Sequence, residues 1–456
     1  MALKKRHKIL LAVVAVIVAA CSQNDTLKVA IDDSPEVLIS FETFHEKSTK
    51  TAAATGEISG PANFTRDAYG NGGMGVWGFK GTPDDIPAPS AVSTYTVDVS
   101  DEDTFIPVFE NTQVWYEDVD DALFRPKGFT YLMPQYWDKQ AEYIFFAYAP
   151  YNNSKNAADQ DLVEFDKTTG CFTVRDIESV QDMSKNNNKT GDALQYGGSG
   201  AGNAYQAADA TGVTDYLMAT YATDQKYSGT NQVGKPGYDP AYTTPEDDYR
   251  YQTVGFTFKH LLSKLYINIQ ADDDLGNDVK SITVDKLTID NMPELSYDKA
   301  VYTQKSPTAP AGTYTPANWT GKALHVIDTN PATNTNATSK NKLYVVKGGT
   351  AQTAPTTQKQ SFYYYVVPNK ADNPDTEGVT EKYMLNIKYS VTHLNDATDG
   401  FDIDPIDLSE YITEMQQNRT YTLTINIGIA HDMIVFSANV VAEWATAHES
   451  NFTVKQ

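Results

Sequence analysis

The chain of 456 residues is 41% hydrophobic and carries a formal net charge of −23. This hydrophobic content argues against intrinsic disorder, and the acidic balance argues against nucleic acid as a partner, because a phosphate backbone would be repelled. A chain of this length usually exceeds what one hydrophobic core serves, so two domains are expected.

The first twenty residues have the pattern of a secretion signal. Four Lys or Arg side chains precede the apolar run 9–20, which is too short to remain in a membrane as a spanning helix. The run ends in small residues and Cys21 follows directly, so that VAAC resembles a bacterial lipobox. We expect a lipoprotein signal peptide over 1–20, cleavage between Ala20 and Cys21, and a lipid anchor on Cys21. The alternative is an ordinary signal peptide followed by a chance cysteine.

The second cysteine, Cys171, is left without a partner if Cys21 carries lipid. No intrachain disulfide is then expected, and stability must come from packing. Cys171 stands in the alternating sequence TTGCFTVRD with no histidine nearby. This context favours a buried structural thiol over a nucleophile.

Alternation of apolar and polar residues with a period of two dominates the chain and predicts antiparallel strands. The clearest case is YTLTINIG at 421–428, and no long amphipathic helix is evident, although FKHLLSKL could hold one turn. The other expected strands are VLISFETF (37–44), EYIFFAYA (142–149), LYINIQ (265–270), SITVDKLTI (281–289), SFYYYVVP (361–368), YMLNIKYSV (383–391) and MIVFSANVVAEW (433–444).

Long polar stretches rich in Gly, Asn, Thr and Pro separate these segments. Those at 184–211, 226–248 and 303–340 are expected to form surface loops. The second has the composition of a domain boundary, which we place near residue 250. The sequence therefore predicts an all-β protein with two sandwich domains, 21–249 and 250–456.

None of the motifs that would indicate an enzyme, a cofactor or a metal centre occurs. HExxH, GxSxG and the P-loop are missing, and no GxGxxG stands between an expected strand and an expected helix, as a dinucleotide fingerprint requires. His260 is expected to cap or border a strand. The acidic stretches 271–278 and 399–407 lack EF-hand spacing and are expected to be solvated turns, with a loop calcium ion left as an alternative for 399–407. We predict a protein that is not an enzyme and uses no cofactor.

Several segments together resemble one family. In chain order they are the lipobox at Cys21, VLISFETF followed by STKTAAA, YWDKQAEYIFFAYAPY, TDYLMATY, VGFTFKHLLSKLYINIQ and NRTYTLTINIGIAHDMIVFSANVVAEW. In content, order and spacing they are similar to the fimbrillin-like proteins of Bacteroidales, which build type V pili. The polar stretches between the segments are not covered by the resemblance.

The resemblance implies a lipoprotein precursor with two transthyretin-like antiparallel β-sandwich domains in tandem. It would cross the periplasm and become exposed on the outer membrane. A trypsin-like protease would then remove the N-terminal segment with the first strand. A C-terminal strand of a neighbouring subunit would fill the opened groove. Partners would be other pilus subunits, the lipid anchor and a surface receptor of a host or another bacterium.

The expected removable strand presents Val37, Ile39 and Phe41 on one face. Its removal would expose apolar area worth on the order of several kcal/mol at roughly 25 cal/mol per Å². It would also leave unpaired backbone groups as a template for another strand. The alternative is that both terminal strands complete their own sandwiches in a monomeric lipoprotein.

The expected donor strand lies near the C-terminus and offers similar alternation. The tail after Trp444 favours a polymerising subunit, whereas the large polar loops favour a tip-like one. The apolar positions of the donor are Ile434, Phe436, Val440 and Trp444, followed by Phe452 and Val454.

Protease cleavage needs a basic residue in an exposed loop after the first strand. Lys50 in STKTAAA stands where the family often carries arginine. Arg66 in NFTRDAYG precedes the expected strand GVWGFK and suits an arginine-specific enzyme better. Lys47 is a third, weaker candidate.

Two rival functions remain open at the level of sequence. The first is a monomeric outer-membrane surface lipoprotein that binds glycans through exposed tyrosines and tryptophans. The second is a cell-surface hydrolase. Proteolysis of the precursor separates the pilus hypothesis from the first rival, because only a pilus subunit should form a ladder of oligomers after cleavage.

Overall fold

The computed structural model has β-strands as its regular secondary structure, and no helix occurs in the part of the chain that it describes. Accordingly, no helix long and apolar enough to span a bilayer is found among these residues. The structure describes residues 38–44, 64–66, 72–82, 95–117, 128–138, 141–181, 216–219, 222–226, 253–271, 278–295, 298–316, 319–328, 342–343, 360–370, 382–408, 411–427 and 434–441.

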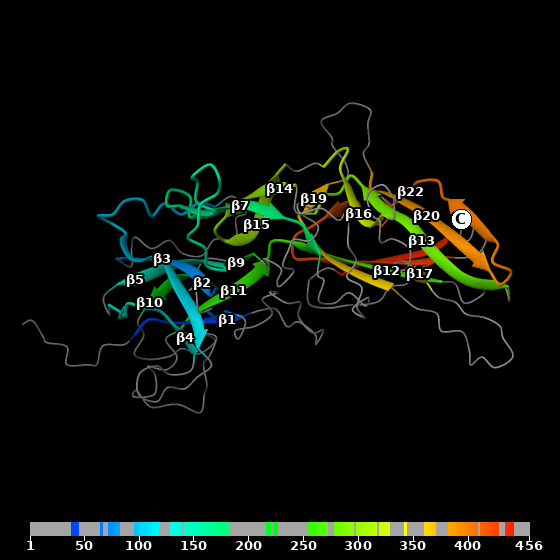
Figure 1. The fold of residues 1–456 in the computed structure, drawn as a ribbon. Coiled ribbons are helices and arrows are strands. Elements are labelled where there is room, and N and C mark those ends of the chain that lie inside the picture. Colours follow the sequence, from blue (N-terminus) through cyan, green and yellow to red (C-terminus); the bar gives the residue numbers. More distant parts are fainter. Residues whose placement is uncertain are drawn as a thin grey trace, which may run out of the picture. The chain divides into compact units, whose positions relative to one another are not determined.

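The first sheet collects strands from both ends of the first half of the chain and one strand from beyond residue 250 (Figure 1). Seven of its eight strands follow the order β1-β11-β9-β5-β2-β3-β4, and the eighth, β10, pairs separately with β5. The bounds are β1 (Ser40–Phe44), β11 (Thr253–His260), β9 (Leu217–Ala219), β5 (Glu142–Ala149), β2 (Met74–Gly81), β3 (Ile106–Glu117), β4 (Gly128–Thr130) and β10 (Ala222–Lys226).

A four-stranded sheet packs against one face of the first sheet and shares a hydrophobic core with it. Aromatic rings fill this core, with Phe165 lying 4.8 Å from Phe146 and 5.2 Å from Trp77 between ring centroids. In sheet order the strands are β15 (Ala309–Thr315), β14 (Lys299–Ser306), β7 (Cys171–Glu178) and β6 (Val163–Asp166).

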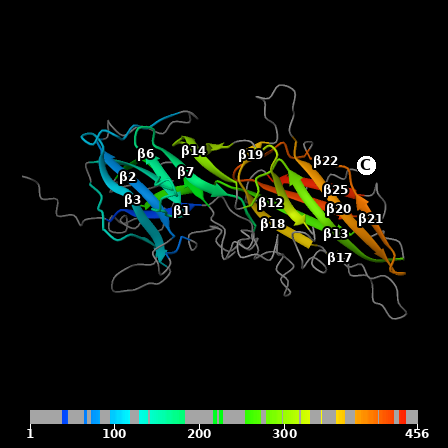
Figure 2. The same ribbon diagram turned by 45° about the horizontal axis from the view of Figure 1, so that its top comes forward.

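The strands of two further sheets are drawn in Figure 2. Their facing side chains are buried in a second core. In β12, Leu265, Ile267 and Ile269 are fully buried, as the alternation predicts. The five-stranded sheet has the order β25 (Ile434–Val441), β24 (Thr420–Ile427), β12 (Ser263–Ala271), β18 (Gln360–Val366) and β8 (Val180–Gln181). The six-stranded sheet has β16 (Ala323–Asp328), β13 (Val279–Asp290), β20 (Met384–His393) and β21 (Thr398–Asp402), with β17 (Lys342–Leu343) on β13 and β22 (Ile406–Asp407) on β20. A small ladder joins β19 (Asn369–Lys370) and β23 (Glu414–Met415).

The all-β prediction is confirmed, but the expectation of purely antiparallel pairing is wrong at two places. β1 pairs with β11 in parallel, and β12 pairs with β24 in parallel. Alternation determines which face of a strand is buried, and it carries no information about the direction of the neighbouring strand.

Strands from before residue 250 also pair with strands from beyond it in two sheets besides the first. β14 pairs with β7, and β18 pairs with β8. Because β11 belongs to the first sheet, strands from beyond residue 250 contribute to both cores. A division of the chain into two domains, 21–249 and 250–456, stays a prediction.

The expectation of a surface loop over 303–340 is wrong for its first part, where β15 and β16 lie. Tyr314 and Trp319 are buried there despite the polar composition. Gln304 explains how this stretch is accommodated, because its side chain accepts a hydrogen bond from the Phe172 amide at 3.1 Å and donates one to the Ala309 carbonyl at 3.0 Å.

Candidate functional site: the seat of the first strand

The strand β1 occupies the edge of the first sheet, beside β11. The five residues Ser40–Phe44 pair in register with Thr253–Thr257. The partner strand lies more than two hundred positions further along the chain, as the colours of Figure 1 make visible. The edge position means that no other strand depends on β1 for its own ladder.

A second segment lines the opposite side of β1. Leu38 forms a β-bridge with Tyr136, and the Ile39 amide donates a hydrogen bond to the Gln135 carbonyl at 2.8 Å. The Tyr131 hydroxyl donates to the Ile39 carbonyl at 2.6 Å. Burial raises the pKa of Tyr131, so its hydroxyl keeps the proton that this bond needs. The two residues before β1 are therefore held by the segment 131–136, whereas β1 itself pairs with β11.

The side chains of β1 and of Ile39, the residue directly before it, fill an aromatic seat in the first sheet. Ile39 is fully buried, and Phe41 is 3% exposed. The Phe41 ring stacks on Phe256 and meets three further rings edge to face, those of Phe109, Tyr131 and Phe145, with centroid distances of 5.3–5.9 Å. Burying Ile39 and Phe41 contributes on the order of 1.5–3 kcal/mol for each side chain.

This seat explains the apolar run that follows Glu142 in β5 (EYIFFAYA), a strand in which every residue is buried. Phe145 faces Phe41, whereas Phe146 faces Phe165 of the four-stranded sheet. A strand with apolar contacts on both faces loses the alternation of a half-buried strand. The seat of β1 is thus the second apolar layer on the first sheet.

Of the two candidate cleavage residues, Arg66 lies within the described residues and Lys50 lies outside them. The side chain of Arg66 is exposed, and its guanidinium lies 4.8 Å from the centre of the Trp115 ring. Its backbone forms a β-bridge with Gly72. Arg66 is accessible at the side chain, while its main chain is held.

The residue two positions before Arg66 is a buried anchor that the sequence did not reveal. Phe64 is fully buried, with its ring 5.8 Å from Phe129 and 5.3 Å from Phe258. Its carbonyl accepts a hydrogen bond from the Tyr116 amide at 2.7 Å. A cut after Arg66 would release Phe64 together with β1, whereas a cut after Lys50 would leave Phe64 in place.

The candidate donor strand forms the edge of its own sheet in this structure. In β25, Ile434, Phe436 and Val440 pair with Ile427, Ile425 and Tyr421 of β24. The remaining predicted site residues, which lie outside the described residues, are Ala20, Cys21, Val37, Trp444, Phe452 and Val454.

The residues that build the seat opposite β1 come from segments that the sequence did not connect with it. Phe109, Tyr131, Phe145 and Phe256 belong to four separate stretches of the chain. Each alternates in its own strand or follows a strand, which is the ordinary pattern of core packing. No local signal distinguishes the rings that contact β1.

The tryptophans expected to serve as exposed glycan platforms are buried where the structure describes them. Trp77, Trp115, Trp137 and Trp319 are each at most 8% exposed. These indole rings offer no open face for stacking on a sugar.

The acidic stretch 399–407 has ionic partners on neighbouring strands. Asp399 contacts His393 at 2.9 Å, and Asp402 contacts Lys388 at 3.5 Å. Among the described residues, no group of three His, Cys, Asp or Glu side chains gathers as metal ligands would. His260 is buried at the end of β11, next to the corner that leads into β12.

Comparison with solved structures gives matches along most of the chain. A fimbrial protein from Bacteroides vulgatus matches at 15% identity and a TM-score of 0.44, over 90% of this chain and 99% of that one. A protein from Bacteroides uniformis that is described as a putative cell adhesion protein matches at 15% identity and a TM-score of 0.36, over 90% of this chain and 100% of that one. The tip fimbrial protein Mfa3 from Porphyromonas gingivalis matches at 11% identity and a TM-score of 0.27, over 83% and 95%.

These identities and TM-scores are too low to establish a family or a function for this chain. No protein-family model matches it, and no curated protein does.

Proposed function

We propose that the protein is a structural subunit of a cell-surface pilus. It is exported as a lipoprotein precursor, anchored through Cys21 in the outer membrane, and trimmed after β1. The vacated seat then accepts a strand from another subunit. The protein performs no catalysis and needs no cofactor in this role.

The observation that carries the proposal is the combination of an edge position with an aromatic seat. Departure of β1 breaks no ladder between other strands, and it leaves the backbone of β11 available as a template for a new strand. The exposed rings of Phe109, Tyr131, Phe145 and Phe256 would favour an incoming strand with apolar residues at alternate positions.

The C-terminal sequence of a second copy meets that requirement. Ile434, Phe436 and Val440 alternate with smaller or polar residues, and Phe452 and Val454 follow further along. Since β25 lies at the edge of its own sheet, its transfer would leave the rest of that sheet paired. The segment 445–456 is the alternative donor.

Limited proteolysis of the purified full precursor tests the proposal. Trypsin under native conditions should release a fragment containing β1, and native gel electrophoresis should then show a ladder of oligomers. A variant lacking residues 433–456 serves as the control, because it keeps the seat and loses the donor. If the wild-type chain gives only a nicked monomer, the pilus function is wrong.

The choice between the two cleavage residues follows from the mass of the released fragment. A fragment ending at Arg66 carries Phe64, and one ending at Lys50 does not. Lys50→Ala and Arg66→Ala, each alone and together, should identify the residue whose loss prevents assembly. Assembly by the double variant would show that neither residue is the cleavage point.

The lipid anchor is tested separately from assembly. Cells supplied with an alkyne-labelled fatty acid should label the wild-type protein and leave Cys21→Ala unlabelled. Labelling that persists in Cys21→Ala would contradict the anchor and would leave the strand-exchange proposal untouched.

A further inference from the structure

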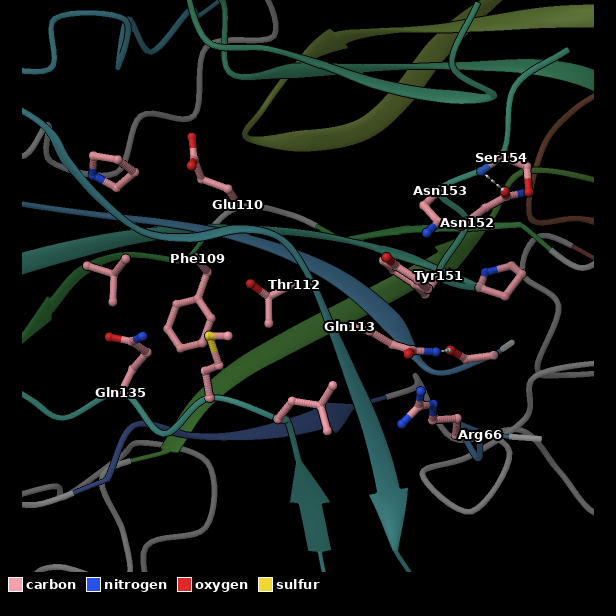
Figure 3. A pocket seen from close by; sticks show the side chains of 16 residues that line it. Arg66, Phe109, Glu110, Thr112, Gln113, Gln135, Tyr151, Asn152, Asn153 and Ser154 are labelled. Carbon is pink, nitrogen blue, oxygen red and sulfur yellow. Dashed lines mark hydrogen bonds between the residues drawn. The ribbon is translucent and has the colours of Figure 1, made fainter. Parts of the chain in front are cut away.

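An open pocket with a volume of about 870 Å³ lies beside β3 (Figure 3). This volume falls within the range of ligand sites, roughly 300–1,000 Å³. Its walls come from β3, the loop after β4, the loop after β5 and the bridge between Arg66 and Gly72. Four separate stretches of chain therefore converge on one space.

A β-bulge shapes the wall that β3 contributes. Glu110 and Asn111 together oppose the single residue Trp77 of β2, because the register passes from Val76↔Thr112 to Gly78↔Phe109. Asn111 takes a positive φ of 43° at this point. Bulges redirect side chains, and they occur often beside functional sites.

A buried hydroxyl connects this bulge to the loop after β5. The Tyr148 hydroxyl lies 3.0 Å from the Asn111 side-chain oxygen and 2.8 Å from the Asn152 carbonyl, and it accepts a hydrogen bond from the Asn152 amide at 3.0 Å. The side chain of Asn152 in turn accepts from the Ser154 amide at 2.8 Å. The loop that forms one rim of the pocket is thus held in a defined geometry.

The pocket lining combines planar polar groups with an apolar lip. Figure 3 shows the labelled polar side chains on several sides of the space rather than along one edge. Leu132 and Met133 stand at the lip with 66% and 76% of their surface exposed. The polar side chains of the lining include Arg66, Glu110, Gln113, Gln135, Tyr151 and Asn153.

This chemistry matches a sugar. Amide, carboxylate and guanidinium groups each present two hydrogen-bonding atoms at a fixed spacing, which suits adjacent hydroxyl groups. The apolar lip can cover the C–H face of a pyranose ring. Polar groups on several sides suit a compact ring with hydroxyls around it better than an extended peptide.

The charges at the pocket favour a neutral ligand. Arg66 and Glu110 are the charged side chains of the lining, and their opposite charges balance. An acidic sugar would also meet a chain with a net charge of −23.

We propose that this pocket binds a neutral saccharide through Tyr151, Asn153 and the side chains around them. The inference concerns the uncut chain and does not rest on strand exchange.

The test uses the full uncut chain on a printed array of neutral, sialylated and sulfated oligosaccharides. The best neutral saccharide is then titrated by calorimetry against three variants. Tyr151→Ala and Asn153→Ala should each weaken binding by about tenfold, because each removes hydrogen bonds to the ligand. Gln160→Ala removes an exposed amide outside the pocket and should leave binding unchanged.

Unchanged thermal unfolding of the variants would show that they fold, so that lost binding reports on the pocket. The proposal is overturned if the array shows no neutral saccharide bound, or only charged ones. Equal affinity of Tyr151→Ala, Asn153→Ala and the wild-type chain would overturn it as well.

Discussion

The ring of Phe41 lies parallel to the ring of Phe256, with centroids 5.9 Å apart and planes inclined by 13°. The first residue belongs to β1 and the second to β11, its parallel neighbour. The stack buries the Phe41 side chain against the first sheet rather than leaving it on the protein surface. A strand held in this way can act as a plug, because its loss uncovers a shaped apolar surface.

Replacing Phe41 with alanine should destabilise the precursor by about 3–5 kcal/mol, the usual cost of removing a buried aromatic ring. Denaturant unfolding of the uncut chain measures this difference. Leu38→Ala is the matched control, since Leu38 is 45% exposed in the same segment and should change stability little.

The same Phe41 variant also tests whether β1 leaves. After proteolysis, the trimmed Phe41→Ala and wild-type chains should have equal stability, because the substituted residue has gone with the released fragment. A difference that persists in the trimmed proteins would mean that β1 stays bound.

Gly75→Ala should destabilise the protein by about 1–3 kcal/mol through overpacking. A Cβ at this position would lie 2.1 Å from the Tyr148 ring. The ring cannot easily move, because its hydroxyl bonds to both Asn111 and Asn152. Gly400→Ala is the control, since a Cβ there meets no atom within 4 Å. Equal thermal unfolding of the two variants would contradict the packing described at Gly75.

His393 should make the stability of the β20–β21 hairpin depend on pH. Its Nε2 lies 2.9 Å from Asp399 and its Nδ1 lies 3.0 Å from Asp278, so both contacts are hydrogen bonds only when the imidazole carries two protons. Asp399 first, and Asp278 after it, raise the pKa of His393 above 6.5. The stabilisation is complete below pH 6.5 and is lost as the pH rises through the folded-state pKa.

An NMR titration of the His393 ring measures that pKa directly. Asp399→Asn should lower it toward 6.5 by removing the carboxylate with the largest effect. An unshifted titration curve in Asp399→Asn would contradict the bridging geometry. Because the partner carboxylates Asp278 and Asp399 are exposed, high salt should also reduce the shift in the pKa of His393.

Cys171 should be almost inert toward alkylating reagents in the folded protein. Burial raises the pKa of its thiol to about 11, so little thiolate exists at neutral pH. In a Cys21→Ser variant, where Cys171 is the only cysteine, iodoacetamide should react at least about tenfold more slowly under native conditions than in denaturant. Equal rates would mean that the core between the first sheet and the four-stranded sheet opens readily around β7.

Sequence alone was sufficient for strands with clear alternation, such as those at 37–44 and 265–270, and for which of their faces is buried, but it missed β15 and β16 within 303–340. The alternation in 37–44 predicted that Ile39 and Phe41 point inward, and both are buried. The context of Cys171 likewise predicted its buried thiol. Period-two patterning carries this information because neighbouring side chains of a strand point to opposite faces.

Only the tertiary structure decided which strands are neighbours. Three features bring together residues that are far apart in the chain. They are the parallel pairing of β1 with β11, the burial of Phe64, and the pocket that both Tyr151 and Arg66 line. The burial of Tyr314 in a polar stretch has the same origin. Alternation in the sequence indicates that a strand must pair with another strand. Which strand it pairs with, in which direction and in which register depends on the side chains of the other segments and on long-range packing.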